Sequence, residues 1–236
     1  MKKKIILTGS EGSIGKYIYK SLNKKYKIIC IDKIKNLSRS FYFCDLTNFN
    51  QSSKIFNKIK KKYKTVDLII NCAGKIHNEP FIRYNKKFST HSINNWNLTI
   101  NNNLKITFNT NKLFVDNFCL NEYASKEKLI INFSSVNSKG IVGQAAYSSS
   151  KSAIETFSKV LSKELGVLNT RVVCISPGYF DLESTDKNLN KKIKENVIRE
   201  TPLRRFGKVN ELINGINFVI QNKFYNGKIL KIDGGL

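Results

Sequence analysis

The sequence has no long apolar run, few prolines and no flexible linker. No stretch reaches the roughly eighteen consecutive apolar residues that a membrane-spanning helix needs. The apolar part of the N-terminal "MKKKIILTGS" covers only about three residues, too short for a signal peptide. With three prolines and no internal repeat in 236 residues, the chain predicts a single domain over residues 1–236 in the cytoplasm.

Acidic residues are also scarce. The chain has 17 Asp and Glu against 41 Lys and Arg, a net charge of +24. Such a charge attracts polyanions, but compositional drift also explains it, because the basic residues are mostly Lys and accompany many Asn and Ile. We favour drift and expect neither a nucleic-acid nor a membrane partner. A basic cofactor-binding or nucleic-acid-binding protein without turnover stays open as an alternative.

Metal-ligand spacing is absent among the five cysteines. Four of them lie within or at the end of apolar, strand-like runs. Buried, reduced thiols in a cytosolic protein account for this pattern, and we expect no metal. The five cysteines are Cys30, Cys44, Cys72, Cys119 and Cys174.

Strand and helix patterns alternate along nearly the whole chain. Apolar runs predict strands at 3–9, 26–32, 41–46, 66–74, 128–135, 170–178 and 227–235. Helical spacing predicts helices at 13–25, 52–63, 95–118 and 145–165, with a polar helical stretch at about 182–222. This alternation is typical of parallel strands with right-handed crossovers. We therefore predict an α/β fold, a Rossmann-like doubly wound parallel sheet flanked by helices.

A glycine-rich turn joins the first predicted strand to the first helix. In "TGSEGSIG" (Thr8–Gly15), glycines at 9, 12 and 15 allow a tight turn and close approach to a pyrophosphate, which the helix N-terminus would bind. Asp32 ends the second strand, where an acid accepts hydrogen bonds from the adenosine ribose. Asp32 and Glu11 favour NAD, whereas Lys33 and Lys35 could receive the extra phosphate of NADP.

Tyr147 and Lys151 are four residues apart on a predicted helix. Residues at this spacing lie on one helix face, about 5 to 6 Å apart. An ammonium stabilises a nearby phenolate, so we expect Lys151 to lower the Tyr147 pKa from its ordinary value of about 10. The pair is therefore a candidate acid–base centre.

Several motifs occur in a characteristic order along the chain. They are "TGSEGSIG", "CDLT", "NCAG", Asn103 seven residues after Trp96, "NFSSV", "YSSSK", "SPG", "TPLRRFGKVNEL" and "NGKILKIDGG". In this order they resemble the short-chain dehydrogenase/reductase family, in its single-domain branch of 3-oxoacyl-carrier-protein-reductase-like enzymes.

The resemblance implies catalytic and cofactor-binding residues. The implied catalytic residues are Asn103, Ser135, Tyr147 and Lys151. Ser135 would hydrogen-bond the substrate carbonyl, Lys151 the nicotinamide ribose, and Asn103 a water that relays protons. The implied cofactor contacts are Gly9, Ser10, Glu11, Ser13, Ile14, Asp32, Asp45, Leu46, Asn71, Ala73, Gly74, Tyr147, Lys151, Pro177, Gly178 and Phe180.

Three features depart from the family pattern. The middle glycine of the loop comes one residue early, as in the extended branch, but the chain ends at "DGGL" without that branch's further region. Leu182 stands where the family often has a nicotinamide-binding Thr. Ser134 has the common interval to Tyr147, whereas Ser135 fits the local "S-S-V" pattern. We favour Ser135.

The resemblance implies an NAD(P)-dependent oxidoreductase that transfers hydride between a nicotinamide and a carbonyl or secondary alcohol. Residues 179–206 would form a substrate flap. A 3-oxoacyl thioester, sugar or polyol fits, anionic forms above all, and a sugar-modifying enzyme of surface-polysaccharide biosynthesis is the alternative. Family members form homodimers or homotetramers through two long helices, here about 97–120 and 145–166.

Overall fold

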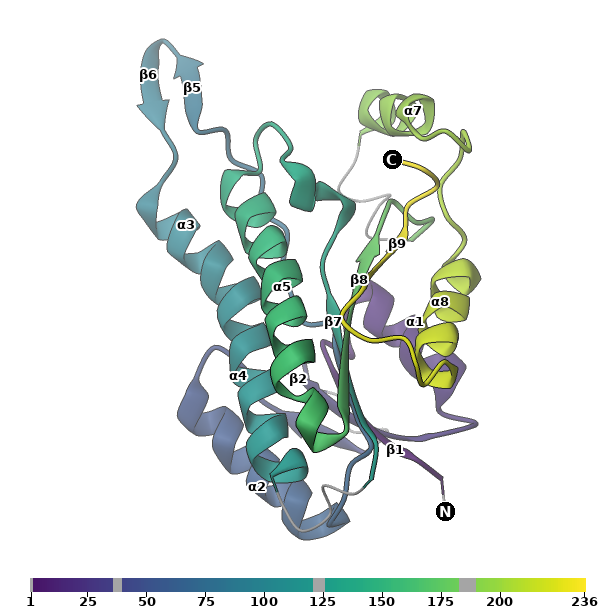
Figure 1. The fold of residues 1–236 in the computed structure, drawn as a ribbon. Helices are drawn as coiled ribbons and strands as arrows, with labels where there is room; N and C mark the ends of the chain where they lie inside the picture. Colours follow the sequence, from purple (N-terminus) through teal and green to yellow (C-terminus); the bar gives the residue numbers. More distant parts are fainter. Residues whose placement is uncertain (1, 36–39, 121–125, 183–189) are drawn as a thin grey trace.

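Parallel strands form one central sheet in the computed structural model, which describes residues 2–35, 40–120, 126–182 and 190–236 (Figure 1). Within these ranges seven strands pair in the order β3-β2-β1-β4-β7-β8-β9, and every pairing is parallel. The doubly wound α/β fold is therefore confirmed. The strands are β1 (Lys4–Thr8), β2 (Lys27–Asp32), β3 (Phe41–Phe43), β4 (Leu68–Asn71), β7 (Lys128–Phe133), β8 (Thr170–Pro177) and β9 (Ile229–Ile232).

Helices cover both faces of the sheet (Figure 1). The helix α1 and the late helix α8 lie on one face, while α2, α4 and α5 lie on the other. The α-helices are α1 (Ser13–Leu22), α2 (Phe49–Tyr63), α3 (Ile93–Ile100), α4 (Ile106–Phe114), α5 (Ala145–Glu164), α7 (Lys191–Glu200) and α8 (Val209–Gln221). None of these helices is long and apolar enough to cross a bilayer.

Alternation along the strands divides the core into two layers. In β1, Ile5 and Leu7 belong to the cluster that packs on α1 and α8, whereas Ile6 belongs to the cluster that packs on α2 and α4. All three are fully buried. Because successive side chains point to opposite faces, a strand covered on both sides is apolar throughout, which explains the continuous apolar runs of the sequence.

A polar network lies inside the second layer. The Asn132 side-chain oxygen accepts hydrogen bonds from the amides of Asn71 at 2.9 Å and Asn111 at 3.0 Å. The Asn132 amide nitrogen donates to the Ser158 hydroxyl at 2.9 Å. One buried side chain thus connects β4, β7, α4 and α5. These bonds satisfy the Asn132 side chain and the amide nitrogens of Asn71 and Asn111, whereas the side-chain oxygens of Asn71 and Asn111 are buried without a partner among the described residues.

The predicted 95–118 helix is interrupted twice. Two π-helical segments, η1 (Asn101–Lys105) and η2 (Val115–Cys119), flank α4. A π segment shifts the helix by one residue and is frequent at functional sites. The predicted strand at 41–46 is also shorter, because only Phe41–Phe43 pair with β2.

A β-hairpin that the sequence analysis did not predict projects from the body before α3 (Figure 1). It joins β5 (Ile82–Asn85) to β6 (Lys87–Thr90) through Lys86, whose φ is +60°. The rings of Tyr84 and Phe88 pack across it at 5.1 Å. All its strand residues are exposed, so hydrophobic burial leaves no pattern that would reveal these strands in the sequence.

The predicted substrate flap is described only in part. Residues 183–189, with Ser184 and Thr185, lie outside the described residues. The remainder contains α7 and the turn before α8, and Leu182 is buried in the first core layer.

The amide network predicts a specific instability. We expect Asn132→Val to lower the free energy of unfolding by about 2–4 kcal/mol, because it leaves the Asn71 and Asn111 donors facing an apolar side chain. Denaturant unfolding would measure this loss. Ile131→Val, on the same strand and equally buried, should cost only about 1 kcal/mol. Equal losses in the two variants would contradict a structural role for the network.

Candidate active site

The glycine-rich loop turns sharply between β1 and α1. Gly9 has a φ of +68°, and its N–H donates to the Ile31 carbonyl at 3.0 Å. A Cβ on Gly9 would lie 2.7 Å from the Ala73 backbone, and one on Gly15 would overlap the Gly9 carbonyl oxygen. The loop therefore requires glycine at both positions. It leads directly into the N-terminus of α1, whose free N–H groups suit a pyrophosphate.

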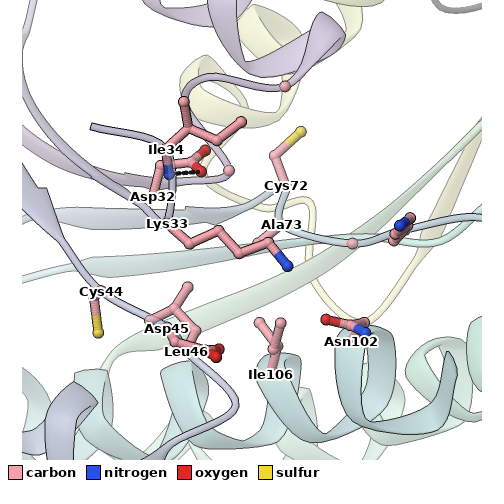
Figure 2. A pocket seen from close by; sticks show the side chains of 14 residues that line it. Asp32, Lys33, Ile34, Cys44, Asp45, Leu46, Cys72, Ala73, Asn102 and Ile106 are labelled. Carbon is pink, nitrogen blue, oxygen red and sulfur yellow. Dashed lines mark hydrogen bonds between the residues drawn. The ribbon is translucent and has the colours of Figure 1, made fainter. Parts of the chain in front are cut away.

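A cavity of about 190 Å³ opens beside this loop at the carboxyl ends of β1, β2 and β4 (Figure 2). The predicted residues among its lining are Gly9, Asp32, Asp45, Leu46, Ala73 and Gly74. Its position at the carboxyl edge of a doubly wound sheet is where dinucleotides bind. The size, the glycine turn and the acid together fit the adenosine half of such a cofactor.

Other lining residues were not among the cofactor contacts that the resemblance implies, although Gly12 belongs to the predicted pyrophosphate loop and Lys33 was a candidate for binding the phosphate of NADP. They are Gly12, Lys33, Ile34, Cys44, Cys72, Lys75, Asn102 and Ile106. Figure 2 shows the Lys33 side chain extending across the cavity, with Asn102 and Ile106 on the helix at its lower edge. The sequence could have indicated most of these residues, because they directly neighbour a predicted contact.

Asp32 is held rigidly at the cavity wall. One carboxylate oxygen accepts from the Glu11 N–H at 2.9 Å. The other accepts from the Ile34 N–H at 3.0 Å (Figure 2). Burial raises the pKa of Asp32, and the backbone hydrogen bonds from Ile34 and Lys33 oppose that rise. The carboxylate is thus oriented before any ligand arrives.

Five other predicted cofactor contacts lie outside this cavity. Glu11 and Ser13 line a separate cavity against α1, and Ile14 packs on the first core layer. Ser10 is buried, and the Asn71 amide is turned into the sheet interior toward Asn132. The Asn71 side chain therefore supports the sheet, because strand alternation directs it away from the cavity.

The predicted cofactor contacts at the end of β8 also lie outside the lining of this cavity. Pro177 ends the strand, and the Gly178 N–H donates to the Ile232 carbonyl at 2.8 Å. Phe180 is 3% exposed and packs its ring against Gly207 in the core. Its side chain is a core contact, because the chain turns inward at this point to pair with Gly207.

Lys151 is buried beneath the cavity. Its ammonium donates to the Phe133 carbonyl at 3.0 Å and lies 5.6 Å from the centre of the Tyr147 ring. Burial lowers the Lys151 pKa to about 8, although the Cys72 and Cys174 thiols oppose the shift. A Cβ on Gly74 would lie 3.4 Å from this ammonium, so the "NCAG" segment and the lysine meet here.

Asn103 also borders Gly74. Its amide donates to the carbonyls of Lys75 at 2.8 Å and Thr99 at 2.9 Å, and its oxygen accepts from the Lys75 N–H at 3.2 Å. A Cβ on Gly74 would lie 2.8 Å from that oxygen. The π segment η1 thus holds Asn103, fully buried, on the same backbone that borders Lys151.

The two candidate serines face different directions. Ser134 is buried, and its hydroxyl bonds to the Lys151 carbonyl at 3.1 Å and the Glu155 carboxylate at 2.8 Å. Ser135 is half-buried, and its hydrogen bond with Tyr147 lowers the pKa of that phenol. Ser135 is therefore the serine that the fold brings to Tyr147.

The electrostatics of Tyr147 differ from the expectation. Burial raises its pKa, which outweighs the hydrogen bond from Ser135. Lys151 does not lower the pKa as predicted, because the ammonium is directed to the Phe133 carbonyl and is itself desolvated. The i, i+4 spacing brings the two residues together but does not pair their polar atoms.

Comparison with known proteins agrees with this geometry. Residues 19–236 match the family pattern described as enoyl-(acyl carrier protein) reductase. The chain is 31% identical over 200 residues to 3-oxoacyl-(acyl-carrier-protein) reductase FabG of Thermotoga maritima, covering 83% of this chain and 76% of that protein. The chain belongs to the short-chain dehydrogenase/reductase family. It is therefore an NAD(P)-dependent oxidoreductase, and the non-catalytic alternative is set aside.

Further relatives of this family support the assignment. Acetoacetyl-CoA reductase of Allochromatium vinosum is 29% identical over 198 residues, covering 83% of this chain and 76% of that protein. A short-chain dehydrogenase from Leptospira borgpetersenii, solved with bound NAD+, superposes with a TM-score of 0.85 at 26% identity. That match covers 100% of this chain and 92% of the solved one.

The glycine turn predicts a sharp effect of one added methyl group. We expect Gly15→Ala to weaken NADH binding at least tenfold and to lower the free energy of unfolding by about 1–3 kcal/mol, because the Cβ forces the loop apart. Fluorescence titration and thermal unfolding would measure both. Gly166→Ala is the control, since its Cβ meets no atom within 4 Å. Unchanged NADH affinity in Gly15→Ala would refute the assignment of the loop.

Burial of the charged Lys151 ammonium should lower the free energy of unfolding. The folded-state pKa of about 8 lies below the usual 10.5, so the unfolded state binds more protons between these values and stability rises with pH there. At pH 7 the full cost is present, and Lys151→Met should gain about 2–3 kcal/mol. The gain should shrink as pH rises from 8 toward 10.5. A gain that does not vary with pH would exclude desolvation of the charge as its cause.

Proposed function

We propose that the protein uses Ser135, Tyr147, Lys151 and Asn103 to transfer hydride between NAD(H) and a carbonyl or secondary alcohol. The observation that carries this proposal is the convergence of Ser135 and Tyr147 over Lys151, at the carboxyl end of β7 and beside the dinucleotide cavity. No single one of these residues would be informative alone, because Tyr and Lys four apart are common in helices.

Each side chain has a role that its contacts support. When bound, the nicotinamide supplies or accepts the hydride. Tyr147 transfers the proton to or from the substrate oxygen, and Ser135 orients that oxygen by a hydrogen bond. Lys151, with its pKa of about 8, places an ammonium 5.6 Å from the centre of the Tyr147 ring, where it would bind the nicotinamide ribose. Asn103, which borders the same Gly74 backbone as Lys151, would hold the water that relays protons.

NAD rather than NADP is the proposed cofactor. Asp32 presents a preoriented carboxylate at the end of β2, which suits ribose hydroxyls and repels a phosphate. Lys33 crosses the same cavity and favours NADP (Figure 2). The solved Leptospira relative holds NAD+, which supports the choice.

The substrate is proposed to be a small carbonyl compound or its alcohol, with an anionic group favoured by the net charge of +24. The reductase relatives support 3-oxoacyl thioesters, and sugars or polyols, as in surface-polysaccharide biosynthesis, form the alternative. We also propose a single domain with a substrate flap near 179–206. Five free thiols support a cytoplasmic location.

A homodimer or homotetramer is proposed as the active assembly. Apolar side chains are exposed along α3, α4 and α5, including Leu98, Phe108 and Val160. An apolar helical surface of this kind suits burial against a second copy.

The proposed function is tested by oxidation of NADH and NADPH with a panel of acyl, sugar and polyol carbonyls. We expect Tyr147→Phe to lower kcat by about 10²–10⁴ on any active substrate, while NADH affinity changes less than twofold. Phe keeps the ring and removes only the proton-transferring hydroxyl. Normal turnover by Tyr147→Phe would exclude the mechanism.

The two serines provide a matched pair. We expect Ser135→Ala to lower kcat by about 10²-fold or more, because the substrate oxygen loses its donor. Ser134→Ala should leave kcat within about threefold and instead lower the free energy of unfolding by about 1 kcal/mol, through its bonds to Lys151 and Glu155. Steady-state kinetics and denaturant unfolding separate the two effects. The opposite ranking of the variants in kcat would assign catalysis to Ser134.

A further inference from the structure

Tyr179 is the first residue after the Pro177–Gly178 turn that ends β8, and the mechanism above does not use it. Its hydroxyl donates to the Asn137 side-chain oxygen at 3.2 Å. The N–H of the same Asn137 donates to the Ser135 hydroxyl oxygen at 3.2 Å. Asn137 therefore joins Tyr179 directly to the serine that faces Tyr147. Tyr179 and Tyr147 also lie near enough for charge on Tyr147 to raise the Tyr179 pKa, beyond the rise caused by burial.

Asn137 is held in one orientation. It is 3% exposed, and its amide nitrogen donates to the Gln144 side-chain oxygen at 2.9 Å within a buried pair. The backbone at Gln144 is held in turn, because the segment 143–144 pairs with Glu79, whose N–H donates to the Gly143 carbonyl at 2.7 Å. With its amide nitrogen turned to Gln144, Asn137 must present its oxygen to Tyr179. The direction of the Tyr179 hydrogen bond follows from this arrangement.

The Tyr179 phenol is left as an acceptor. Its single proton is used on Asn137, and no donor to its oxygen occurs within the described ranges. The residue is half-buried, and Asn137 joins its phenol to Ser135, the serine beside Tyr147, so we place the phenol at the edge of the space for a substrate. A phenol oxygen whose proton is donated in one hydrogen bond can still accept another hydrogen bond from a ligand. A ligand that supplies an O–H at this point satisfies it, whereas a plain alkyl group leaves it unpaired.

We propose that Tyr179 is a substrate-specificity residue, whose phenol oxygen accepts a hydrogen bond from a hydroxyl group beside the reacting carbonyl, with Asn137 as the residue that positions it. This rests on the proposed function and narrows its substrate class to hydroxy ketones and hydroxy aldehydes, the carbonyl forms of polyols and sugars. A site that binds a substrate hydroxyl discriminates strongly against analogues that lack it.

The test compares 3-hydroxy-2-butanone with 2-butanone, which differ by that hydroxyl alone. We expect the wild-type enzyme to prefer the hydroxy ketone in kcat/KM at least tenfold. Tyr179→Phe should lower kcat/KM for the hydroxy ketone by about three- to tenfold, the effect of one neutral hydrogen bond, and leave 2-butanone within twofold. Tyr84→Phe, an exposed tyrosine of the hairpin, is the control and should change neither value.

Asn137 gives an independent variant of the same contact. Asn137→Ala should also reduce the preference for the hydroxy ketone, because Tyr179 loses the acceptor that orients its proton. Asn137→Asp retains an acceptor for Tyr179 and should keep more of the preference than Asn137→Ala. An equal loss on both substrates in Tyr179→Phe would show a role in packing only and would overturn the proposal, as would no loss on either.

A binding measurement separates this proposal from the proposed function. Calorimetry would titrate 3-hydroxy-2-butanone into the Tyr147→Phe enzyme with NADH, where no turnover is expected, and into the Tyr147→Phe/Tyr179→Phe double variant. The double variant should bind about three- to tenfold more weakly. Equal affinity, or no binding to either, overturns the role of Tyr179. Absence of turnover with every panel substrate in the wild type instead counts against the proposed function.

Discussion

The shared register of the parallel strands is the constraint on which the site depends. Thr8 in β1 pairs with Asn71 in β4, Asn71 pairs with Asn132 in β7, and Asn132 pairs with Cys174 in β8. β1 and β4 therefore end at the same level of the sheet, while β7 continues one residue further and β8 three residues further. The segments that follow them meet at one edge, although more than 160 residues of chain separate the first from the last.

That edge collects four of the segments that form the site, while Asn103, Tyr147 and Lys151 reach it from the helices η1 and α5. The glycine turn follows β1, Gly74 follows β4, Ser135 follows β7, and Gly178 follows β8. Backbone crowding then limits side-chain size, since a Cβ at Gly9, Gly74 or Gly178 would approach another atom to within 2.8 Å. The amide network around Asn132 connects β4, β7 and α4 inside the second core layer. Fold stability and site geometry thus rest on the same pairings.

Much of this organisation was predictable from the sequence, for identifiable reasons. The strands of the sheet are buried on both faces and read as continuous apolar runs, and the glycine turn has a fixed place between strand and helix. The hairpin was missed because its strand residues are all exposed. Asn71 and Phe180 were predicted to contact the cofactor from the resemblance to the family, but their side chains turn into the interior.

By itself the sequence determined the doubly wound fold, the loop for the dinucleotide and the pairing of Tyr147 with Lys151 on one helix face, because periodicity and local spacing encode them. Only the tertiary structure showed that Ser135 bonds to Tyr147 while Ser134 bonds to Glu155, since the direction of a side chain at a strand end depends on what packs on each face. It also decided the charge balance of the site. Burial depends on the whole fold, and here it raises the Tyr147 pKa and lowers that of Lys151.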